Sequence, residues 1–116
     1  MVRISSKNDR RFDDRHPGTG LVARIGGQEI EVLDVSIGGL KIASPKGLKT
    51  WRGDALDFVL ISTHWPDMKQ PAGRGVVRAL TDSWIALQFD RPSYDLMKCV
   101  SRHVATLLWG DRPYGY

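Results

Sequence analysis

The sequence is poor in cysteine and has no long apolar run, and both shortages narrow the class of protein. One cysteine, Cys99, cannot form a disulfide within the chain, so we expect a buried, unreactive thiol there. The three histidines are widely separated in the sequence, and no spacing indicates a zinc site. No stretch approaches the roughly 18 apolar residues of a membrane span, and the first residues lack the apolar segment of a secretory signal. We therefore expect a cytoplasmic protein without a membrane span.

The sequence also shows no pattern of catalytic residues. Its serines, histidines and aspartates form neither a nucleophile elbow nor an ordered triad. We therefore expect a protein that is not an enzyme and needs no cofactor or metal. The net charge of +4 is mild and favours an anionic partner over a cationic one. With 116 residues, of which 41% are hydrophobic, the chain suits one domain with a modest core.

The first part of the chain differs from the rest. Residues 1–18 are polar and charged and end in His16-Pro17-Gly18, so they cannot bury enough apolar area to offset the entropy of ordering. We interpret residues 1–18 as a flexible N-terminal arm. Residues 19–116 then form the folded part of a single domain.

Short apolar runs separated by turn residues predict about six β-strands. We expect strands over 21–25, 29–37, 40–44, 54–62, 73–81 and 84–90. Gly26 and Gly27 supply the turn of the first hairpin. The apolar positions change from even to odd between Val32 and Leu33, which predicts a β-bulge or a sharp twist there. Beyond the bulge, Asp34 and Ser36 share the outward face.

The last segment has helical periodicity. A helix is predicted over 93–109, with Ser93 as its N-cap and Gly110 just past its end. Its apolar stripe consists of Met97, Val100, Val104, Leu107 and Leu108. We expect this stripe to cover one open side or end of a barrel, and His103 to complement the helix dipole. The fold class is therefore mainly β: a six-stranded antiparallel barrel with a C-terminal α-helix.

Three arginines of the arm form the first candidate binding segment: Arg10, Arg11 and Arg15. Considered alone, such a segment is as well explained by a solvated charged tail. A guanidinium group nevertheless offers a planar fork of N–H donors that matches phosphate oxygens or the O6/N7 edge of guanine. The arm therefore has the donors for a phosphorylated guanine ligand.

The second candidate segment lies at the end of a predicted strand and contains Asp34, Ser36, Gly38 and Gly39. Considered alone, it is a strand end followed by a glycine turn. The carboxylate of Asp34 can accept from the N–H donors of guanine, and the hydroxyl of Ser36 can add a bond beside it. Gly38 and Gly39 leave room for a base or ribose against the backbone. The two segments together could enclose a guanine nucleotide that carries more than one phosphate.

In combination these segments resemble a known family. Arg11-x-x-x-Arg15, about twenty residues ahead of Asp34-x-Ser36-x-x-Gly39, resembles the paired motif of the PilZ domain, a bacterial receptor module for cyclic di-GMP. The resemblance extends to the order of elements and implies a split-barrel-like fold. It also implies that Arg11 and Arg15 bind phosphates and guanine edges, that Asp34 and Ser36 bind guanine, and that Gly39 permits close approach.

Two further positions bear on the resemblance. Arg10 precedes the first motif arginine, where an arginine in this family is linked to binding of an intercalated pair of cyclic di-GMP molecules. Ala86 stands where many family members have glycine, away from the motifs in the sequence.

The resemblance implies a cyclic di-GMP receptor that changes conformation on binding and regulates a downstream partner such as motility or exopolysaccharide machinery. Two alternatives stay open: a barrel that binds RNA or single-stranded nucleic acid, and a protein–protein adaptor that binds no nucleotide. The first rests on the basic arm and the four tryptophans. We favour core or rim packing over base stacking for these tryptophans, because they lie in separate elements, and so consider a nucleic-acid partner the weaker interpretation.

Overall fold

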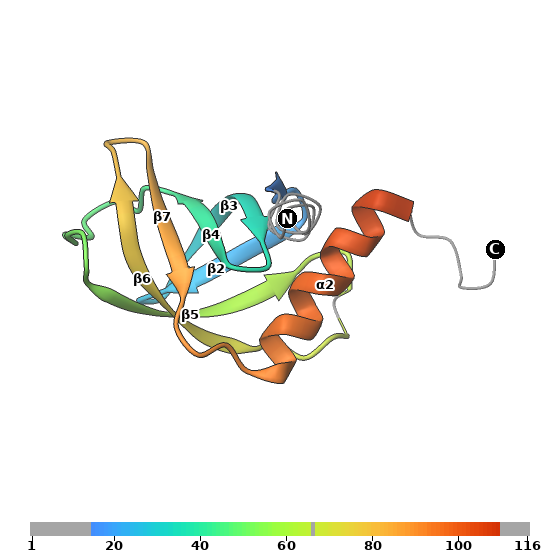
Figure 1. The fold of residues 1–116 in the computed structure, drawn as a ribbon. Coiled ribbons are helices and arrows are strands. Elements are labelled where there is room, and N and C mark those ends of the chain that lie inside the picture. The colour runs from blue at the N-terminus through green and yellow to red at the C-terminus, as the bar shows by residue number, and fades with distance from the viewer. Residues whose placement is uncertain (1–14, 66, 110–116) are drawn as a thin grey trace, which may run out of the picture.

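The computed structural model describes residues 15–65 and 67–109. Within these ranges seven strands precede one helix (Figure 1). The elements are β1 (His16–Pro17), β2 (Leu21–Ile25), β3 (Gln28–Ser36), β4 (Gly39–Ala43), β5 (Ala55–Ser62), β6 (Ala72–Leu80), β7 (Trp84–Phe89) and α2 (Tyr94–Trp109). All strand pairs are antiparallel.

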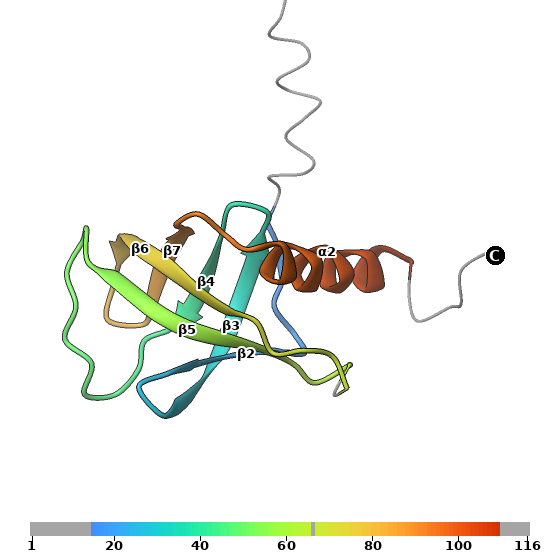
Figure 2. The same ribbon diagram turned by 90° about the horizontal axis from the view of Figure 1, so that it is seen from below.

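The strands close into a barrel. Their order is β3-β2-β5-β6-β7-β4, and β4 pairs with β3 to complete the circle (Figure 2). Closure leaves no free edge among these six strands, while β1 is an additional short strand on β3. The mainly β architecture predicted from the sequence, a six-stranded barrel with a C-terminal helix, is therefore confirmed.

Alternation along each strand separates the core from the surface. On β4, Leu40 and Ile42 are fully buried, and on β7, Ile85 and Leu87 are at most 3% exposed. Lys41 and the other residues between these positions face outward, since successive side chains point to opposite faces of a sheet. This alternation gives β4 and β7 an outer surface that is continuous with that of β3.

The predicted irregularity in β3 is present. The β3–β4 register shifts between Val32 and Asp34, so that Val32 pairs with Ile42 and Asp34 with Lys41. The predicted hairpin turn is also present, because Gly26 and Gly27 both have positive φ, at 57° and 84°.

Part of the segment interpreted as an arm is ordered against the barrel. His16 pairs with Val35, and Pro17 pairs with Asp34. Since β4 occupies one side of these β3 residues, β1 occupies the other, next to the end of β2. The chain therefore enters the barrel beside the second half of β3, while residues 1–14 of the predicted arm lie outside the described residues.

Helix α2 begins as predicted and packs with part of the predicted stripe, because Val100 is buried and Met97 and Val104 pack against the core. The Ser93 hydroxyl accepts a hydrogen bond from the Leu96 amide at 3.1 Å, as an N-cap does. The buried residues are Leu96, Cys99, Val100 and His103, whereas Leu107 and Leu108, both predicted to pack, are 37% and 58% exposed. The stripe prediction was wrong there because only the first part of α2 lies against the barrel, and its last turns extend past the strands (Figures 1 and 2). Gly110, which was predicted to follow the end of the helix, lies outside the described residues.

The remaining sequence-based expectations concern the thiol, metals and membranes. Cys99 is 2% exposed, and burial raises the pKa of its thiol, which confirms a buried cysteine. The described ranges contain no cluster of three or more histidine, cysteine or acidic side chains placed to ligate a metal ion. In the same ranges, no helix is both long and apolar enough to span a bilayer.

Candidate functional site

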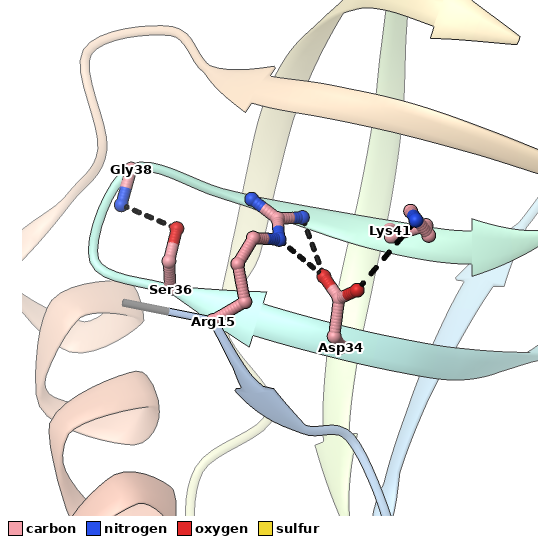
Figure 3. Close-up of polar contacts among 5 residues, drawn as sticks. All are labelled: Arg15, Asp34, Ser36, Gly38 and Lys41. Atoms are coloured by element: carbon pink, nitrogen blue, oxygen red, sulfur yellow. Dashed lines mark hydrogen bonds and ion pairs between the residues drawn. The ribbon is translucent and has the colours of Figure 1, made fainter. Parts of the chain in front are cut away.

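The predicted site residues that the structure describes gather at one end of the β3–β4 hairpin. We call this region the arm corner and define it by Arg15, Asp34, Ser36, Gly38 and Gly39. The base of the arm reaches it through β1, and the β3–β4 turn forms its other side (Figure 3). Residues that the sequence separates are therefore brought together, whereas Arg10 and Arg11 lie outside the described residues.

A direct contact joins the two motifs. The Arg15 guanidinium donates from Nε to Asp34 Oδ1 at 2.6 Å, and its Nη2 lies 2.5 Å from the same oxygen. Lys41 Nζ lies 3.9 Å from the other oxygen, Oδ2 (Figure 3). The Asp34 carboxylate is thus shared between two cations, and its side chain is only 22% exposed against 46% for Arg15.

The base of the arm is held from a second direction. His103 on α2 donates from Nε2 to the Pro17 carbonyl oxygen at 2.8 Å. The imidazole is 2% exposed, and burial lowers its pKa, with the neighbouring His64 and His16 acting in the same direction. The expectation that His103 complements the helix dipole was therefore wrong, because tertiary packing turns it toward β1. Its neutral form links α2 to the entry of the arm.

Ser36 combines burial with a local hydrogen bond. It is 4% exposed, less than its predicted outward face implies, and its Oγ accepts from the Gly38 amide at 3.2 Å. This bond fixes the two-residue turn between β3 and β4. The hydroxyl proton stays available as a donor, since the amide uses only a lone pair. Ser36 therefore shapes the turn and can still donate a hydrogen bond.

The two motif glycines have different surroundings. A Cβ on Gly39 would lie 2.0 Å from the Leu87 carbonyl oxygen, so the close passage of β4 and β7 excludes any side chain there. A Cβ on Gly38 would meet nothing nearer than the Ser36 hydroxyl at 3.9 Å. Barrel packing thus accounts for Gly39 by itself, whereas Gly38 faces open space at the corner.

Two residues beside the corner, Lys41 and Trp84, were not predicted from the sequence. Lys41 pairs with Asp34 across the hairpin, and its ammonium lies 4.4 Å from the centroid of the Trp84 ring. The first contact follows from hairpin symmetry about the turn after Ser36 and could have been predicted. Ala86 pairs with Lys41 and therefore lies in the same cross-strand row as Asp34, closer to the motifs than the sequence indicated.

Comparisons with known proteins show the fold. No protein-family model and no curated protein sequence matches the chain. Among solved structures, the chain is similar to the Bacillus subtilis inhibitor of motility MotI (also DgrA), with a TM-score of 0.68 and 15% identity over 84% of this chain. It spans 50% of the length of that chain.

Two further solved structures are similar. An uncharacterised Legionella protein has a TM-score of 0.58 and 16% identity, over 82% of this chain and 94% of that one. The Borreliella burgdorferi protein PlzA, solved in complex with c-di-GMP, has a TM-score of 0.49 and 10% identity, over 86% of this chain and 43% of that one. The barrel with its closing helix is thus a fold already seen in solved structures.

Proposed function

We propose that this chain is a receptor for cyclic di-GMP that binds the nucleotide at the arm corner and passes the bound state to a downstream protein. The observation that carries the proposal is the Arg15–Asp34 contact, because it joins the arm motif to the strand motif in one place. The β1–β3 pairing keeps the entry of the arm beside this contact.

The chemistry of the corner fits a guanine nucleotide with two phosphates. Arg15, together with the arm residues Arg11 and Arg10, would supply guanidinium donors for phosphate oxygens and guanine edges. Asp34 supplies an acceptor for the guanine N–H groups, and Ser36 a hydroxyl donor. Open space at Gly38 supports the close approach of a ring to the turn.

The contact between Arg15 and Asp34 is weak enough for a ligand to replace. A partly exposed ion pair contributes about 0.2–1 kcal/mol, whereas a hydrogen bond to a charged group contributes about 1.5–3 kcal/mol. Four or five such bonds to the ligand exceed the roughly 2–5 kcal/mol needed to order a binding segment. The balance supports an affinity of about 1 μM, which corresponds to about 8 kcal/mol.

Binding would draw the arm arginines onto the barrel surface around the ligand. A ligand that contacts both Asp34 and the arm arginines favours the closed arrangement by its differential affinity for it. The downstream protein would recognise that surface. Motility machinery is the first class to test, since the fold is shared with an inhibitor of motility.

Isothermal titration calorimetry of the full chain with cyclic di-GMP tests the proposal. We expect saturable binding at about 1 μM, with a stoichiometry that distinguishes one ligand from an intercalated pair. Affinity should depend shallowly on salt, because few phosphates are neutralised. Absence of binding up to about 1 mM, where the free energy is only about 4 kcal/mol, would overturn the proposal. Tighter, steeply salt-dependent binding to an oligonucleotide would replace it with the nucleic-acid alternative.

A further inference from the structure

The outer face of β3, β4 and β7 carries a second group of side chains next to the arm corner. Register places Asp34 opposite Lys41, Lys41 opposite Ala86, and Ala43 opposite Trp84. Directly paired residues of an antiparallel sheet share a face, as do residues two apart on one strand. All five side chains therefore belong to one continuous surface, with the acidic residue at one end and the indole at the other.

Short side chains lie in the middle of this surface. Ala43 and Ala86 project only a methyl group beside Lys41, and the Trp84 ring is partly buried rather than fully covered. The Lys41 ammonium bridges the two ends, at 3.9 Å from Asp34 Oδ2 and 4.4 Å from the centroid of the Trp84 ring. Lys41 is thus the side chain that occupies the space over the indole.

From this arrangement we infer that Trp84 and Lys41 extend the nucleotide site: the Trp84 ring stacks one purine of the ligand, and Lys41 moves from Trp84 to a ligand phosphate. This inference rests on the proposed function. The other purine is assigned to Asp34. This residue lies two strands away from Trp84 and two residues further along the strand direction.

The distance between the two ends suits a ligand with two bases. At a strand spacing of about 4.8 Å and a rise of about 3.3 Å per residue, the Cα atoms of Asp34 and Trp84 lie about 12 Å apart. Their side chains reach toward each other, because Asp34 Oδ2 and the Trp84 ring centroid lie 3.9 Å and 4.4 Å from the same Lys41 ammonium. A cyclic dinucleotide, which carries a base on each side of its phosphodiester ring, can hydrogen-bond at Asp34 with one base and stack on Trp84 with the other.

Lys41 is suited to move. Its flexible stem carries a compact ammonium with three donors, and its side chain is 31% exposed. Its contacts with Asp34 and Trp84 are a long ion pair and a cation–π contact, both replaceable by a phosphate that brings its own negative charge. Departure of Lys41 would uncover the indole and free one oxygen of Asp34 for guanine.

The test combines calorimetry with tryptophan fluorescence on full-length variants. Trp84→Ala should weaken cyclic di-GMP binding at least fivefold, as loss of one stacked base does, and Trp84→Phe should weaken it less. Trp51→Ala is the matched control, since Trp51 is 73% exposed in a loop, and should bind as the parent does. Lys41→Met should weaken binding at least threefold and flatten its salt dependence.

Fluorescence separates stacking from a structural effect. Cyclic di-GMP should quench the emission of the parent and of Trp51→Phe, and this quenching should be lost in Trp84→Phe with its melting temperature retained. Unchanged affinity in Trp84→Ala, or equal quenching in Trp84→Phe, would overturn the inference while leaving the proposed function intact. Failure of the parent to bind at all would instead overturn the proposed function.

Discussion

Two regions of the barrel surface contain the same kinds of contact: the arm corner, and the outer face of β5, β6 and β7 away from it. An arginine binds an aspartate at both, Arg15 with Asp34 at the corner and Arg74 with Asp57 between β5 and β6. Asp57 and Arg74 are paired residues on neighbouring strands, and Arg74 lowers the pKa of Asp57 chiefly through their hydrogen bond. That pair belongs wholly to the sheet. The Arg15–Asp34 contact instead joins the sheet to an entering segment of chain.

The turns of two hairpins also contain the same kind of hydrogen bond, from a backbone amide to a side-chain hydroxyl. At the β3–β4 turn Ser36 accepts from the Gly38 amide, and at the β6–β7 turn Thr81 accepts from the amides of Ser83 and Trp84. Chemistry alone therefore does not distinguish the two regions. What distinguishes the arm corner is the coincidence of a motif turn, a shared carboxylate and the base of the arm.

The largest expected difference between the regions is in ligand affinity. Arg15→Ala removes charge-assisted bonds and should weaken cyclic di-GMP binding at least tenfold in calorimetry, with little change in melting temperature. Arg74→Ala is the matched control and should bind as the parent does. Equal affinities of the two variants would place the ligand elsewhere.

Substitutions at Gly38 and Gly39 should distinguish an effect on core packing from an effect on ligand binding. Gly39→Ala forces a Cβ against the Leu87 carbonyl and should lower the free energy of unfolding by about 1–3 kcal/mol in urea denaturation. Gly38→Ala should leave stability nearly unchanged but weaken ligand binding, because its Cβ occupies the open space. Loss of stability in both variants would mean that Gly38 also serves packing.

The two turn hydroxyls offer a smaller, matched comparison. Ser36→Ala and Thr81→Ala each remove an acceptor for a turn amide and should each lower the free energy of unfolding by about 0.5–1.5 kcal/mol. Only Ser36→Ala should also weaken cyclic di-GMP binding. If Thr81→Ala weakens binding as much, the effect is a general one on the barrel.

The smallest expected effect concerns the link between α2 and the arm. Because burial lowers the pKa of His103 in the folded protein, the unfolded chain takes up more protons as the pH falls below about 6.5, and stability should decline there. His103→Gln keeps an N–H donor for the Pro17 carbonyl but does not titrate. Its melting temperature should therefore fall less between pH 7.5 and 5 than that of the parent. An equal fall in both proteins would show that other groups dominate.

The sequence by itself determined the local elements. Period-two alternation set the strands, paired glycines set the first hairpin, the phase change at Val32 set the bulge, and Ser93 set the start of the helix. Each depends on residues close together in the chain, so each can be inferred from pattern and turn chemistry. The candidate residues of the arm corner were predicted differently, from their side-chain chemistry and from the resemblance to a family motif, and their role in binding stays a prediction.

Only the tertiary structure decided which of these elements meet. The pairing of β1 with β3, the bond from His103 to Pro17 and the place of Lys41 between Asp34 and Trp84 all follow from barrel closure and the docking of α2. The choice of Leu96 and Cys99 over Leu107 and Leu108 as buried residues has the same origin. Such contacts join residues far apart in the chain, and their formation depends on how the whole barrel packs rather than on any local pattern.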